Sequence, residues 1–130
     1  MHDHRGAVAV WTAVGLPAFV IAMGIGVDFA GHAAASQEAQ AVASEAARAA
    51  GQQVDLTGPR ARVDAPQAIR AAHDYLAGSP FTGSASVSGD VVTVDVTGSY
   101  ECQFLSIIGI NAIGVSGIAS SQVHSVDSDR

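Results

Sequence analysis

An uninterrupted apolar run near the N-terminus constrains this chain more than any other feature. Residues 7–27 read AVAVWTAVGLPAFVIAMGIGV and contain no charged side chain, with Arg5 before them and Asp28 after them. As a helix rising 1.5 Å per residue, the run would be about 31 Å long, which matches the hydrocarbon core of a bilayer. It therefore predicts a single transmembrane helix over residues 7–27.

The six residues before the run predict the orientation of that helix. They read MHDHRG, and Arg5 is the one arginine or lysine among them. Because arginine and lysine beside a membrane span tend to stay in the cytoplasm, we expect the N-terminus inside and the C-terminus outside. Residues 1–6 would then be the cytoplasmic leader of a single-pass protein of the cytoplasmic membrane.

A second stretch continues the helical pattern with more polar side chains. Residues 28–51 are rich in alanine and contain no proline, so intrinsic propensity favours a helix here too. Gly51 is a candidate C-terminal cap. We expect one almost continuous helix from about Ala7 to Ala50, in which residues 28–51 form an extracytoplasmic extension of the membrane span.

Several residues in this helix indicate how it would bend and pack. Pro17 lacks a backbone donor and predicts a bend near the middle of the span. Asp28 marks the expected exit from the lipid, where its carboxylate would stay hydrated or pair with Arg48 or with an arginine of a partner. Small residues recur at every fourth position and form a smooth stripe that another membrane helix could approach closely, namely Ala18, Ala22, Gly26, Ala30 and Ala34.

The remaining residues, 52–130, begin with a polar linker and a short helix. The linker over residues 52–62 contains glycine and proline. Asp64 is placed to cap the helix that follows, because Asp favours the N-cap and Pro66 then falls in the first turn. Gly78 and Pro80 would end this helix, whose apolar side chains recur at helical spacing and need a surface to cover.

Beyond that helix the pattern changes to strands. Residues 84–88 and 91–98 alternate and are separated by a Gly-Asp turn signal, so they predict a hairpin. Residues 104–110 read as an apolar link or helical turn, and residues 115–126 as a third strand. The expected fold is therefore α+β, with a long N-terminal helix, a short second helix and a small antiparallel sheet of about three strands.

The charge and composition exclude some functions. The net charge is −6 and all six basic residues are arginine, so the chain would repel a phosphate backbone and we expect no nucleic-acid partner. Aromatic residues make up 5% of the chain, which predicts a thin core in the domain outside the membrane. Cys102 is the only cysteine, so it is either a free buried thiol or part of a bridge between chains.

Catalytic and metal-binding patterns are weak. Asp28 and His32 share one helical face and His73 adjoins Asp74, but a metal site needs three or four converging ligands. No serine lies in a Gly-x-Ser-x-Gly elbow. The set of nucleophile, base and orienting group that an enzyme requires is not met. We therefore expect a protein that is not an enzyme and holds no cofactor.

Two other readings of the N-terminal segment remain open. A secretory signal peptide could be cut after the stretch from His32 to Ala35, although the apolar run is longer than the core of an ordinary signal. The mature chain would then begin near Ser36 as a small secreted binding domain. Alternatively, the chain is a single-pass membrane-anchored envelope protein with a small binding domain.

The residues from Arg5 to Gly51 resemble the TadE/TadG-like proteins of tight-adherence (Flp-type) pilus systems. The shared features are an Arg-Gly pair, an apolar helix containing Leu-Pro, an Asp, and an alanine- and glutamine-rich stretch ending in AARAAG. The ending, with its valine-rich strand, apolar link and GVSGIASSQV, is also similar. The resemblance implies a pilin-like fold and a structural or assembly role in a type IV-related pilus, whereas the two alternatives above are unrelated to pili.

The resemblance also implies processing and partners. A prepilin peptidase would cut between Gly6 and Ala7, and the N-terminal helix would pack among other pilin-like subunits, with the inner-membrane pilus platform and membrane lipid as further partners. Prepilins usually carry glutamate at the fifth position after the cut, and this chain has Trp11 there. That departure favours a minor pilin or pseudopilin, in the membrane or in a surface pilus, over a major pilin.

Overall fold

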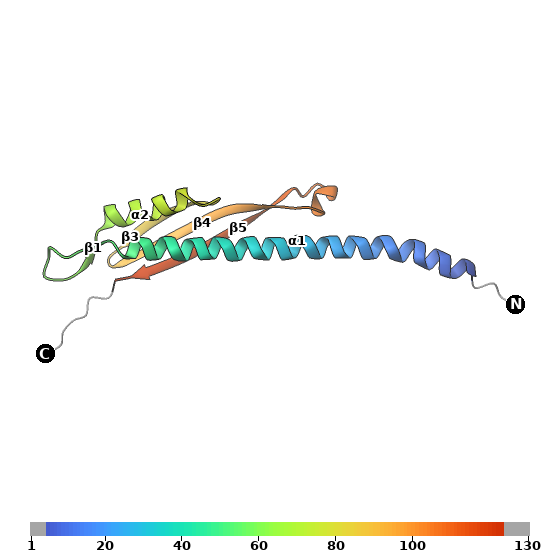
Figure 1. Cartoon of the computed structure of the whole chain (residues 1–130), viewed down its shortest axis with the longest axis horizontal. Coiled ribbons are helices and arrows are strands. Elements are labelled where there is room, and N and C mark those ends of the chain that lie inside the picture. The colour runs from blue at the N-terminus through green and yellow to red at the C-terminus, as the bar shows by residue number, and fades with distance from the viewer. Residues whose placement is uncertain (1–4, 124–130) are drawn as a thin grey trace, which may run out of the picture.

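A computed structural model describes residues 5–123, in which one long helix forms the spine of the molecule. Helix α1 (Arg5–Gly51) runs without interruption through Pro17. The other elements lie along its C-terminal half, while its N-terminal half projects beyond them and curves gently toward the N-terminus (Figure 1). Residues 1–4 of the expected leader and residues 124–126 of the expected third strand lie outside the described residues.

The sheet has three antiparallel strands in the order β3-β4-β5. These are β3 (Thr82–Ser88), β4 (Val91–Glu101) and β5 (Ala112–Gln122). The predicted hairpin turn is present, and Gly89 adopts a φ of 61° there, a left-handed conformation that favours glycine. Alternation places the side chains of Val92, Val94 and Val96 on one face of β4, where all three are 0% exposed.

Two helices cover that face of the sheet. Helix α2 (Ala65–Ala77) begins where Asp64 accepts a hydrogen bond from the Gln67 N–H at 3.2 Å, and Pro66 lies in its first turn. It packs on β3 and on α1, while α1 lies across β4 and β5. The core between the layers consists mainly of alanine and valine, namely Ala39, Ala43, Ala46, Ala47, Ala50, Ala68, Ala72, Leu76, Val92, Val94, Val96 and Val115.

This arrangement confirms the α+β, pilin-like fold expected from the sequence. The apolar link forms the 3-10 turn η1 (Leu105–Ile108). The stretch expected to be a polar linker differs from that expectation. It contains a short antiparallel ladder between β1 (Val54–Asp55) and β2 (Arg62–Val63). Strands of two residues carry no alternation long enough to be recognised in a sequence.

Glycines allow α1 to approach the sheet closely. Side chains added at three of them would collide with a facing residue: at Gly31 with the ring of Tyr100, at Gly51 with the Ser121 side chain, and at Gly117 with the backbone of Ala39. Gly51 is the last residue of α1, and positive φ angles in the described chain occur at other glycines. Gly51 thus lies against the Ser121 side chain of β5 and is not a left-handed cap.

Candidate membrane and assembly surface

The N-terminal half of α1 presents an apolar surface that the rest of the chain leaves uncovered. Only 6% of the most apolar 18-residue window of this helix is buried, and one candidate membrane span is found among the described residues. A core helix of a water-soluble domain would be mostly covered. An apolar surface this extensive marks contact with a membrane or another protein. The exposed large side chains include Val8, Val10, Trp11, Val14, Leu16, Phe19, Val20, Ile21, Met23, Ile25, Val27 and Phe29.

The single hydroxyl within the apolar run is satisfied internally. The Thr12 hydroxyl donates a hydrogen bond to the Val8 carbonyl at 2.9 Å, one turn earlier in the helix. A polar group in hydrocarbon must find its partner within the protein. The run is therefore compatible with lipid at this position as well.

The predicted packing and processing residues all lie on this uncovered half of α1. The small-residue stripe faces away from the sheet, and Gly26 has no atom of another segment near the position of a Cβ. On the opposite side of the helix, Gly24 and Asp28 are buried. The residues left exposed are Gly6, Ala7, Trp11, Pro17, Ala18, Ala22, Gly26 and Ala30.

Asp28 is not hydrated as the sequence suggested but is completely buried, at 0% exposure. One carboxylate oxygen accepts the Gln103 N–H at 2.7 Å. The other accepts the N–H groups of Phe104 at 2.9 Å and Leu105 at 2.6 Å. Asp28 thereby joins α1 to the chain between β4 and β5, across more than seventy residues of sequence.

The surroundings of Asp28 shift three acid–base equilibria. Removal from solvent favours the neutral form of Asp28 and would raise its pKa. The hydrogen bonds donated by the backbone N–H groups of residues 103–105 and by the Tyr100 hydroxyl stabilise the carboxylate more strongly. The pKa of Asp28 therefore lies below its ordinary value of 3.8. Burial, followed by the negative charge of Asp28, raises the pKa of Tyr100 and that of Cys102. Cys102 is a free, buried thiol, and its raised pKa lowers its reactivity toward a disulfide.

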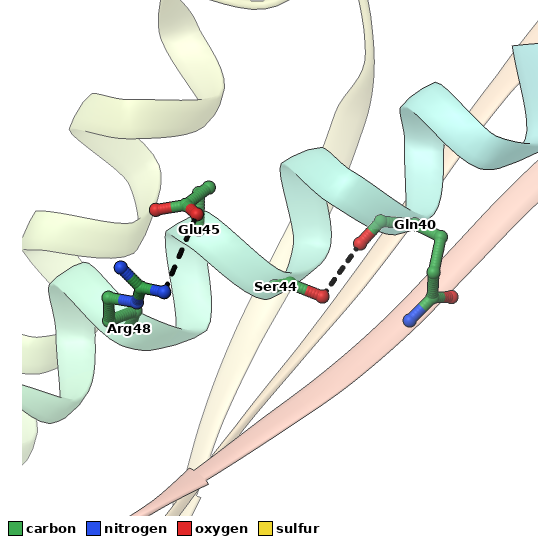
Figure 2. A network of polar contacts seen from close by, with 4 residues as sticks. All are labelled: Gln40, Ser44, Glu45 and Arg48. Carbon is green, nitrogen blue, oxygen red and sulfur yellow. Dashed lines mark hydrogen bonds and ion pairs between the residues drawn. The ribbon is translucent and has the colours of Figure 1, made fainter.

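The other expected partners of Asp28 are engaged elsewhere. His32 Nε2 lies 3.2 Å from the Gly114 carbonyl oxygen, which can only accept, so the ring proton belongs on Nε2. Arg48 lies 3.9 Å from the Glu45 carboxylate on the exposed face of α1 (Figure 2). Between residues 5 and 123, no three His, Cys, Asp or Glu side chains converge as metal ligands.

Gln40 occupies the free edge of the sheet. Its amide donates to the Ile118 carbonyl at 2.7 Å and accepts the Ile118 N–H at 3.2 Å, as a neighbouring strand would. Figure 2 shows its side chain directed from α1 toward β5, with the Ser44 hydroxyl donating to the Gln40 carbonyl at 2.9 Å. Because unpaired edges promote association between sheets, this contact closes part of β5 against further strand addition.

A small α+β domain built on the C-terminal half of a long helix, whose apolar N-terminal half is uncovered, defines a pilin-like protein. A family model described as "Tad: Putative Flp pilus-assembly TadE/G-like" matches residues 6–53. The resemblance drawn from residues 5–51 is thereby confirmed for that segment. No curated protein and no solved structure gives a significant match.

Sequence reasoning missed the segment that faces Asp28. Residues 103–105 are far from Asp28 in the chain, and no sequence motif around either of them predicts that they are in contact. The one available signal was that residues 103–113 contain no charge and many large apolar side chains. That pattern predicts an apolar link or helical turn but does not identify Asp28 as its partner.

Proposed function

We propose that this protein is a minor pilin or pseudopilin-like component of a Flp-type pilus. Residues 7–27 anchor it in the cytoplasmic membrane, residues 1–6 are the leader on the cytoplasmic side, and residues 28–130 face outward. The observation that carries the proposal is the uncovered apolar half of α1 on a segment matched by a Flp pilus-assembly family. Release from the bilayer requires another apolar surface to receive this helix, and a bundle of pilin helices supplies one.

The contacts of residues 28–32 support retention of α1 in the mature protein. Asp28 holds the chain between β4 and β5 through three backbone hydrogen bonds, and His32 contacts Gly114 of β5. Cleavage of a secretory signal near Ser36 would remove both side chains and leave their partners on β4 and β5 unpaired. Cleavage between Gly6 and Ala7 leaves all these contacts intact.

The small-residue stripe is the proposed contact with neighbouring subunits. It faces away from the domain, so a second helix can approach Ala22 and Gly26 without displacing the sheet. Trp11, in place of the usual glutamate, favours an accessory position over repeated incorporation. The partners in this proposal are other pilin-like subunits, the membrane platform of the pilus, the prepilin peptidase and lipid.

The substitution Gly26→Arg tests this proposal. We expect the variant to remain in the membrane fraction, because Gly26 lies one residue from the end of the run and a long arginine side chain reaches the interface. Its incorporation into pilus material should fall at least tenfold, for which a loss of about 1.4 kcal/mol of helix packing suffices. The measurement is quantitative immunoblotting of sheared surface material and membranes from cells that assemble the pilus.

The matched control is Gly58→Arg, which adds the same charge in the loop between β1 and β2, where a side chain has room. This control should assemble as the unmodified protein does. Unchanged assembly of Gly26→Arg, with normal membrane levels, would contradict a packing role for the stripe.

A further inference from the structure

The connection between β4 and β5 exposes large apolar side chains that the proposed function does not use. We call residues Phe104–Ile110 the apolar loop. Ile107 is 83% exposed and Ile108 is 72% exposed, and no charged residue occurs between Glu101 and the end of β5. Exposure of neighbouring isoleucines on a short loop of a water-soluble domain is unfavourable.

The apolar loop lies against the part of α1 that belongs to the proposed membrane span. An apolar groove of about 260 Å³ is lined by Val20, Ile21 and Ile25 of α1 and by Phe104, Leu105, Ile107 and Ile108 of the loop. Val20 precedes the end of the run at Val27 by seven residues, or about 10 Å along the helix. If residues 7–27 span the bilayer, the loop lies at the depth of the outer acyl chains.

Most backbone N–H groups of the loop find acceptors within the protein. Asp28 accepts the N–H groups of residues 103, 104 and 105, and the Ser106 hydroxyl donates to the Gln103 carbonyl at 2.9 Å. Four further N–H groups donate to carbonyls within the connection at 2.8–3.1 Å, those of Cys102, Ile107, Gly109 and Ile110. Irregular backbone is tolerated at membrane depth only when its hydrogen bonds are internal.

We infer that the apolar loop inserts into the outer leaflet beside α1, so that lipid acyl chains cover Ile107 and Ile108. The inference rests on the membrane span of the proposed function. Asp28 is then the residue that makes insertion possible, because it binds three N–H groups that water cannot reach in the lipid. The chain contacts the membrane at two points, and the second restricts rotation of the domain about α1.

Continuity of the surface favours lipid over a second protein chain. The groove between the loop and α1 is lined by apolar side chains alone, and Ile21 and Ile25 continue into the exposed apolar side chains of the run. Protein interfaces normally combine an apolar centre with polar and charged groups at the rim. A depth of 5–10 Å is typical of segments that lie in the interface between headgroups and acyl chains.

Spin labelling of the full chain in liposomes tests the inference. Single cysteines replace Ile107, Val14 and Leu56 in a Cys102→Ala background, each carries a nitroxide, and its collision rates with oxygen and with a water-soluble nickel chelate are measured. Val14 reports the span, and Leu56, which is 76% exposed, is the matched apolar control. Leu56 directly follows β1, which lies at the opposite end of the molecule from the N-terminus (Figure 1). Thermal unfolding by circular dichroism verifies that each variant is folded.

We expect the label at position 107 to behave like the label at position 14. Its ratio of oxygen collision rate to nickel collision rate should be several-fold above that of the label at position 56. An Ile107 label as accessible to nickel as Leu56, with Val14 still in lipid, would overturn the inference and leave the span intact. If Val14 is also accessible to nickel, the span itself fails and the inference fails with it. A label at Ile107 that is shielded from both reagents and broadened by a neighbouring label would place a second copy on the loop, which also overturns insertion.

Discussion

Replacing Gly117 by alanine should lower the free energy of unfolding by about 3 kcal/mol, at the upper end of the usual cost of overpacking. A Cβ at this position of β5 would lie 2.5 Å from the Ala39 carbonyl oxygen and 2.6 Å from the Gln40 nitrogen. Both are backbone atoms of α1, so neither can rotate aside. The helix would have to move away from the sheet and open the layer of alanines and valines that forms the core.

Gly114→Ala is the matched control for this prediction. It makes the same substitution in the same strand, at a position where no atom lies within 4 Å of the added Cβ. We expect it to change stability by no more than about 0.5 kcal/mol, as for an ordinary surface substitution. Denaturant unfolding of both variants in detergent micelles measures the difference, and equal stabilities would contradict the close contact between α1 and β5.

Asp28→Asn should lower the Tm by roughly 10 °C, because a buried N–H left without an acceptor is strongly destabilising in a small domain. The asparagine amide has nearly the same shape, but its NH₂ group must face at least one of the N–H donors of residues 103–105. Asp74→Asn, on the exposed face of α2, is the control and should leave the Tm unchanged. Equal Tm values for the two variants would show that the three hydrogen bonds contribute little.

The lowered pKa of Asp28 predicts how the loss of Tm caused by Asp28→Asn depends on pH. Since the pKa of folded Asp28 is lowered below 3.8, its contribution to stability is fully present above pH 3.8 and is lost as the pH falls through the folded-state value. The Tm difference between the unmodified protein and Asp28→Asn should therefore be constant from neutral pH to about pH 4 and shrink below it. A difference that shrinks already between pH 7 and pH 5 would contradict the lowered pKa.

The elements of this fold are largely predictable because their signals are local. An uncharged run followed by an alanine-rich stretch specifies one long helix, and strict alternation specifies that Val92, Val94 and Val96 share a buried face. Asp64 and Pro66 mark the start of α2 by the chemistry of the N-cap alone. None of these inferences requires knowledge of which segments meet.

The contacts between elements are less predictable, since α1 has small residues on more than one face. The stripe that includes Gly26 can be recognised as a surface of small residues, but nothing in the sequence shows that Gly24 faces Phe104 in the connection between β4 and β5 and that Gly31 faces Tyr100 of β4. Asp28 illustrates the same limit. A carboxylate at the end of an apolar run suggests a hydrated boundary, whereas the structure gives it partners that are distant in the chain and are backbone N–H groups, which no side-chain pattern identifies.

These contacts also bear on how the protein works. The C-terminal half of α1 is fixed to the sheet by the core alanines and by Gln40, and Asp28 fixes it to the chain between β4 and β5. Helix and domain therefore move as one body. The other half leaves most of its side chains exposed, except where Gly24 and Asp28 meet the chain between β4 and β5. An assembly that receives this half in a bundle of helices would therefore display the domain in a fixed orientation on its outside.

The mass of the mature chain tests the central claim most directly, namely that α1 is retained as the anchor and assembly helix. Intact-mass spectrometry would be applied to protein from native membranes and from sheared surface material. The account predicts a chain that begins at Ala7, with the apolar run and Asp28 both present. A chain that begins near Ser36 would contradict it, because the membrane span, Asp28 and His32 would all have been removed.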